Sequence, residues 1–149
     1  MTPDEQRELA IQLYNTTWDL IDKPDRGPDD DDEMLHRAHA SRYLWGGVGT
    51  AANRARGEWL CSRVYAVLGR PEPALHHARR CLELVEANPA DLEEWDLPAA
   101  YEAVARAQSV AGDLGEARRY VELGRAAAAR VADEEDRAPL EADFATIRT

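Results

Sequence analysis

The sequence predicts an all-α protein made of antiparallel helical hairpins, with about seven helices, the last of which caps the stack. Apolar residues recur with the period of a helix along almost the whole chain. Alternating β-branched runs and tight hairpin turns, the usual signs of strands, are nearly absent. A length of 149 residues suits one domain with a hydrophobic core.

The first two helices are expected to form an N-terminal hairpin over residues 1–49. Thr2 is the expected N-cap, and a first-turn proline and an acid three residues on complete a capping box. Periodicity continues to about Ile21, where a proline- and glycine-containing segment breaks it. The acids at 29–33 are interpreted as a solvated linker whose last members favour the positive end of the next helix. That second helix is expected over residues 31–45 and ends at a pair of glycines.

Residues 50–131 are expected to form two further hairpins, each turning at a glycine. The third and fourth helices, about 50–68 and 71–87, are separated by a Gly-Arg-Pro turn and end at an Asn-Pro pair. The fifth helix, about 95–111, leads through Gly112 into a sixth, whose inner positions are Ala117, Val121, Gly124 and Ala128.

Residues 132–149 are expected to form a capping helix. The helix itself is expected from about Asp133 to Arg148, with Leu140, Phe144 and Ile147 on one side and charged residues on the other. One apolar side and one charged side suit the end of a helical stack.

The second and third hairpins overlay at an offset of 43 residues. The matching pairs are Cys61 with Val104, Ser62 with Ala105, Arg63 with Arg106, Gly69 with Gly112 and Ala74 with Ala117. Each segment is therefore a helix, a glycine turn and a second helix. One such hairpin cannot bury its apolar face alone, so neighbouring hairpins are expected to stack.

These segments resemble the tetratricopeptide (TPR) family of helical-hairpin repeats. Tyr101, Val104 and Ala105 match the aromatic, large apolar and small positions of its first helix, and Ala117 and Val121 match the later pair. The chain departs from the family at Glu58, where a tryptophan is expected, and in its longer period. The resemblance implies a groove lined by the first helix of each hairpin, and a binding or scaffold role.

Five residues are expected to line this groove: Arg56, Trp59, Arg63, Glu102 and Arg106. The first three recur at i, i+3 and i+7 on one helix, and the last two occupy the equivalent stripe of the next hairpin. A cationic, aromatic-edged groove would bind an acidic peptide or a carboxylate ligand. The alternative is that Arg63 and Arg106 pair with Glu58 or Glu102 for structural reasons.

A second cluster of polar and aromatic residues is expected around the second helix: His36, His39, Arg42, Tyr43, Trp45 and His77. These side chains are interpreted chiefly as packing within the bundle. The alternative function is a small-molecule- or metal-binding bundle, possibly a hydrolase, centred on His36, His39 and His77. Glu33 and His36 have a di-iron spacing, but no second Glu-x-x-His motif occurs.

Composition narrows the classes of function and partner. A net charge of −11 disfavours nucleic acid and anionic membranes. No signal peptide or membrane-spanning run is evident, so a cytoplasmic protein with reduced cysteines is expected. No nucleophile elbow or phosphate loop occurs, which favours a non-enzymatic protein without catalytic residues, cofactor or metal.

Self-association through the N-terminal helix is also expected. This helix carries apolar residues on two neighbouring sides, Leu9, Leu13 and Leu20 on one and Tyr14 and Trp18 on the other. A stack with an uncovered apolar end usually hides it in a contact. The sequence therefore predicts a homodimer in which Tyr14 and Trp18 face the partner copy.

Overall fold

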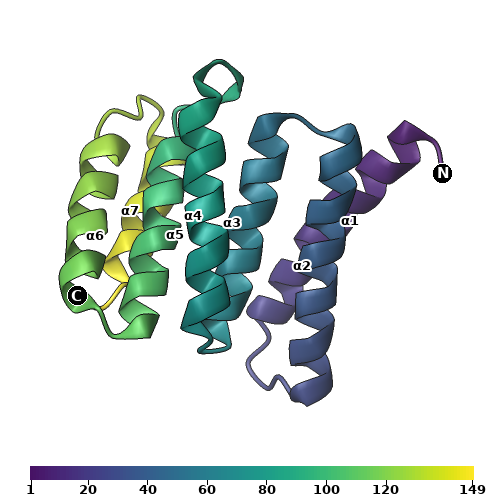
Figure 1. Ribbon diagram of the computed structural model, residues 1–149, viewed down its shortest axis with the longest axis horizontal. Helices are drawn as coiled ribbons and strands as arrows, with labels where there is room; N and C mark the ends of the chain where they lie inside the picture. The colour runs from purple at the N-terminus through teal and green to yellow at the C-terminus, as the bar shows by residue number, and fades with distance from the viewer.

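The computed structural model describes residues 1–149 and confirms the all-α class. It has seven α-helices and one short 3-10 helix at Pro89–Asp91, and no strand. Consecutive helices run side by side in alternating directions (Figure 1). They are α1 (Pro3–Ile21), α2 (Pro28–Val48), α3 (Ala51–Val67), α4 (Pro71–Ala87), α5 (Asp96–Ala111), α6 (Leu114–Ala128) and α7 (Glu134–Ala145).

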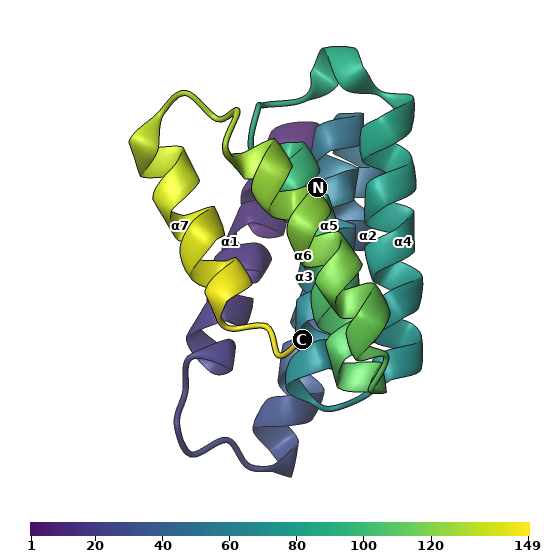
Figure 2. The ribbon, with the colours of Figure 1, turned by 90° about the vertical axis from the view of Figure 1, so that its left-hand side faces the viewer.

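The helices form a stack in which the odd-numbered helices also contact one another. Besides the contacts between successive helices, α3 packs on α5, α1 touches α3, and α7 touches α5. Figure 2 shows α1 and α7 projecting on the same side of the molecule, away from α2 and α4. We call the side of α3 and α5 that α1 and α7 border the inner face.

Both helices of the first hairpin begin with a proline in their first turn, but the predicted bounds of α2 are wrong. In α1 the capping box is present, with Thr2 N donating to Glu5 Oε2 over 2.8 Å and Glu5 N donating to Thr2 Oγ1 over 3.1 Å. The helix α2 begins at Pro28, so the acids interpreted as a linker belong to it, and Asp29, Asp30 and Asp31 stand in its first turn, where the helix dipole stabilises them.

The glycine pair at 46 and 47 does not end α2, which continues to Val48. Gly49 follows as the extended C-cap residue, and it passes so close to Trp45 that an added Cβ would lie 2.8 Å from its ring. Close approach, rather than the glycine pair itself, therefore sets this helix end.

The two glycines that coincide at the 43-residue offset adopt the same conformation. Gly69 has a φ of 69° and Gly112 a φ of 84°, and both follow the last turn of a first hairpin helix. In each case the next residue closes the helix end: Arg70 N donates to Tyr65 O over 2.9 Å, and Asp113 N donates to Gln108 O over 3.0 Å. The two turns are structurally equivalent.

Small residues let the helices pack closely around an alanine-rich core. Ala74, Ala78, Ala105 and Ala117 are fully buried. The ring of Phe144 in α7 lies directly over Gly124 of α6, where a side chain would collide with it. This contact seats the last helix on the end of the stack.

Candidate functional site

The five residues predicted to line a groove come together on the inner face. Arg56, Trp59 and Arg63 lie on α3, and Glu102 and Arg106 lie on α5. Trp59 Nε1 donates a hydrogen bond to Glu102 Oε2 over 3.1 Å, and Arg106 Nε donates to Glu102 Oε1 over 2.7 Å. The buried Glu102 carboxylate therefore joins the two helices within the predicted site.

Arg63 is held by two carboxylates and two indole rings. Its Nη2 lies 3.7 Å from Glu102 Oε1 and 3.4 Å from Asp143 Oδ1 of α7. Its guanidinium carbon lies 5.5 Å from the ring centre of Trp18 and 5.2 Å from that of Trp59. The buried Nε has no hydrogen-bond partner, so the ring faces supply part of its electrostatic compensation. The side chain is mostly enclosed within the protein.

Arg106 is likewise committed to the protein's own groups. Besides Glu102, its guanidinium donates to the carbonyl oxygen of Asp143 over 3.1 Å and to Thr146 Oγ1 over 2.9 Å. These two contacts tie α5 to the end of α7. Arg63 and Arg106 thus cross-link the inner face, and each already has a carboxylate partner.

Arg56 differs from the other two arginines because it stands at the edge of a pocket. It forms a bidentate pair with Asp96, with Nε and Nη2 3.0 Å and 2.9 Å from the two carboxylate oxygens. Its guanidinium carbon lies 4.3 Å from the ring centre of Trp95. Asp96 also accepts from Glu93 N over 2.9 Å, which fixes the carboxylate at the start of α5. The Arg56 side chain remains 29% exposed.

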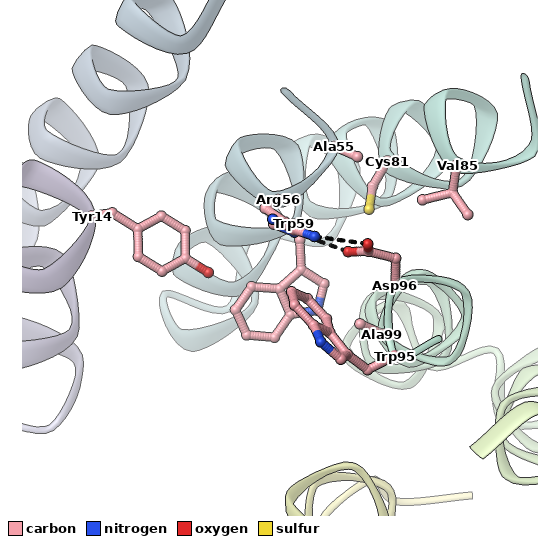
Figure 3. Close-up of a pocket in the computed structure, with 9 residues that line it drawn as sticks. All are labelled: Tyr14, Ala55, Arg56, Trp59, Cys81, Val85, Trp95, Asp96 and Ala99. Atoms are coloured by element: carbon pink, nitrogen blue, oxygen red, sulfur yellow. Dashed lines mark hydrogen bonds and ion pairs between the residues drawn. The ribbon is translucent and has the colours of Figure 1, made fainter. Parts of the chain in front are cut away.

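The pocket beside Arg56, which we call the aromatic slot, is a cleft of about 180 Å³. Figure 3 shows Tyr14 pointing from α1 toward α3, with Trp59 and Trp95 close to the Arg56 and Asp96 pair. The lining is largely apolar and comes from α1, α3, α4 and the start of α5: Tyr14, Ala55, Arg56, Trp59, Cys81, Val85, Trp95, Asp96 and Ala99.

A second hollow of about 240 Å³ adjoins the slot, and we call it the outer groove. It shares Tyr14, Arg56 and Trp95 with the slot. Its other lining residues are Ile11, Asn15, Trp45 and Asn53. The slot and the outer groove together form a continuous surface between α1, α2, α3 and the start of α5.

Sequence reasoning missed several residues of this surface. Tyr14 was expected to face a second copy, and Trp45 was grouped with the histidines, yet both line the outer groove. Trp95 and Asp96 were not singled out. Asp96, at the start of α5, pairs with Arg56 of α3 across 40 residues, and no local spacing reveals such a contact.

The second predicted cluster is brought together only in part, on the helices α2, α3 and α4. His39 Nε2 lies 2.9 Å from the Tyr65 hydroxyl, and His39 Nδ1 lies 3.7 Å from Cys61 Sγ. The ring of His77 lies 5.2 Å from that of His39 and stacks on Tyr65. His39 therefore uses both ring nitrogens within the protein.

Glu58 links the remaining members of this cluster. Its two carboxylate oxygens lie 3.0 Å from Arg42 Nε and 2.6 Å from His77 Nδ1. His36 and Tyr43 are exposed and stand apart, Tyr43 with 83% of its surface accessible. The predicted set is thus divided between a packed network, the outer groove at Trp45 and the open surface.

The packed network is not poised for nucleophilic chemistry. Burial raises the pKa of the Cys61 thiol to about 12, and burial together with His77 lowers the pKa of His39. Both groups are therefore neutral near pH 7, the opposite of a reactive thiolate and imidazolium pair. Both cysteines are free and buried. No three His, Cys, Asp or Glu side chains gather as a metal-binding set.

The apolar residues predicted on two sides of the N-terminal helix are half-buried. Trp18 packs against Trp59 with ring centres 5.8 Å apart and ring planes tilted by 31°, and Tyr14 faces the slot. Burial raises the pKa of Tyr14 to about 12. Both rings pack toward α3, and the homodimer through the N-terminal helix stays a prediction.

Comparison with protein-family models, with curated proteins and with solved structures finds no match for this chain. None of its helices combines the length and apolar character needed to cross a lipid bilayer.

Proposed function

We propose that this protein is a non-enzymatic binding or scaffold module of the TPR-like kind, and that it holds a protein or peptide on its inner face. The equivalent glycine turns at Gly69 and Gly112 and the stacked hairpins support the repeat assignment. The aromatic slot supports the binding role, since tryptophan and tyrosine side chains beside a partly exposed arginine are typical of interface hot spots.

The proposed contact surface differs from the stripe expected from the sequence. Arg63 and Arg106 are bound to Glu102, and Arg63 also to Asp143, so neither guanidinium offers a free charge to an acidic peptide. Arg56, Trp59, Tyr14 and Trp95 meet at open space instead. The slot and the outer groove therefore replace the arginine stripe as the proposed contact surface.

Nothing in the geometry favours the alternative of a metal- or small-molecule-binding bundle centred on the histidines. Both ring nitrogens of His39 and one of His77 have protein partners, and His36 is exposed.

Site-specific photo-crosslinking tests the proposal. A photoreactive amino acid is placed at Ile11 or Asn15 in the outer groove, and at the exposed Ala40 of α2 or Arg118 of α6 as matched controls. We expect a crosslinked partner at the two groove positions only. The crosslink should disappear when Ala99→Leu narrows the slot while helical circular dichroism is retained.

Equal labelling at all four positions, or labelling that survives Ala99→Leu in the folded protein, would show that the inner face is not the contact surface.

A further inference from the structure

The aromatic slot has room for a single ring. Its volume is about 180 Å³, and an apolar cavity of about 150 Å³ is enough to hold benzene. Pockets for whole drug-sized ligands start at about 300 Å³. The slot is therefore matched to one aromatic side chain rather than to a complete small molecule.

The outer groove supplies groups that suit the main chain beside that ring. Asn15 and Asn53 line it, and a carboxamide both donates and accepts hydrogen bonds, as a peptide bond does. Asn53 Oδ1 is used by Thr50 N over 3.0 Å, which leaves the amide nitrogen as a donor. A peptide whose aromatic residue fills the slot would cross these two side chains.

Charge on the borders of the inner face favours a basic peptide. The helix α1 carries four carboxylates and one arginine, and α7 carries four carboxylates besides Asp143 and one arginine. Between them the three arginines of the predicted site are paired with Asp96, Glu102 and Asp143. The floor is thus nearly neutral and its borders are acidic, a field that attracts lysine and arginine.

We infer that the inner face binds a peptide segment that inserts one aromatic side chain into the aromatic slot and carries lysine or arginine next to it. This inference rests on the proposed function and reverses the charge of the partner expected from the sequence.

Selection from a displayed library of random peptides, about twelve residues long, tests the inference on the full-length protein. We expect the selected peptides to share one Phe, Tyr or Trp flanked by basic residues. In a synthetic copy of such a peptide, replacing the aromatic residue by alanine should weaken binding about thirtyfold, the effect of losing an interface hot spot.

Variants of the protein test whether the aromatic residue binds in the slot and whether the basic residues bind beside the acids of α1. Ala99→Leu should abolish binding of the synthetic peptide, whereas Ala40→Leu on an exposed surface of α2 should not. Glu8→Lys with Asp19→Lys, two exposed changes on α1, should weaken binding roughly threefold to tenfold. The control Glu86→Lys with Glu122→Lys changes the net charge equally on α4 and α6 and should have little effect.

The outcomes separate this inference from the proposed function. Peptides that are blocked by Ala99→Leu but lack an aromatic residue, or carry acidic flanks, would overturn the inference and leave the proposed function standing. If no peptide is selected, or if selected peptides bind equally well to Ala99→Leu, both are overturned.

Discussion

Glu102 is the side chain on which the inner face depends most. It is almost fully buried, yet an indole and a guanidinium donate to it and a second guanidinium lies 3.7 Å away. A buried carboxylate is tolerated only with such partners. It occupies the position equivalent to Trp59 at the 43-residue offset, so the hydrogen bond between them joins matching places in successive hairpins.

Replacing Glu102 by alanine should lower the free energy of unfolding by about 3 kcal/mol, because Arg106 and Arg63 then lose a buried counter-charge. Urea denaturation followed by circular dichroism measures this. Glu86→Ala, on the exposed side of α4, should stay within about 0.5 kcal/mol of the unmodified protein. A similar small effect at Glu102 would mean that Asp143 alone compensates both arginines.

His39 should make the protein less stable as pH falls below neutral. Burial, with a contribution from His77, lowers its pKa below the usual 6.5. As pH drops through 6.5 the unfolded chain takes up a proton that the folded protein does not, so stability declines. Above that value His39 is neutral in both states and contributes no pH dependence.

His39→Gln should therefore reduce the loss of stability between about pH 7.5 and pH 5.5 in urea denaturation. The Glu58 carboxyl acts at lower pH, since His77 and Arg42 outweigh the effect of burial and hold its pKa below 4.5. An unchanged pH dependence in the variant would contradict the assignment to His39.

The hairpin turns were the best predicted elements, because their chemistry is local. Gly69 and Gly112 mark helix ends where φ is positive, and caps such as Thr2 act on residues within one turn. The predicted end of α2 is wrong because the glycine pair at 46 and 47 remains helical. Its real end depends on the approach of Gly49 to Trp45, a feature of the folded chain.

Alanine substitutions at three glycines should affect stability differently in the turns and within a helix. Gly69→Ala and Gly112→Ala should each cost about 1 to 2 kcal/mol, because alanine is strained at positive φ. Gly47→Ala should be neutral or stabilise by up to about 1 kcal/mol, since this glycine is helical and a Cβ there meets nothing. Thermal denaturation of the three variants measures the contrast, and a loss at Gly47 like that at Gly112 would contradict it.

At the scale of the whole molecule, periodicity predicted the stack but not the site within it. Helical hairpins of similar length pack in order, so α3, α5 and their small residues were foreseeable. The slot arises where α1, α4 and the start of α5 converge on α3. Two of the residues that line the slot, Tyr14 and Asp96, are 82 residues apart in the sequence, and their proximity depends on how the hairpins are stacked.

The net charge of −11 should make the folded protein more stable in salt. Acids outnumber cations on α1, α2 and α7, so self-repulsion opposes the compact state. Its most buried ion pairs are shielded from solvent and are screened less than this repulsion. Raising NaCl from about 50 mM to about 500 mM should increase the melting temperature. A decrease would show that exposed ion pairs outweigh the repulsion.

Three of the four tryptophans of the chain, Trp45, Trp59 and Trp95, line the slot or the outer groove, and the fourth, Trp18, lies against Trp59. Indole emission reports the polarity around the ring, and Trp59 and Trp95 line the slot, where a bound ring would displace water. Occupation of the slot should therefore shift the intrinsic fluorescence to shorter wavelength and protect it from quenching by iodide. A titration without any attached dye would therefore follow binding through side chains of the proposed contact surface itself.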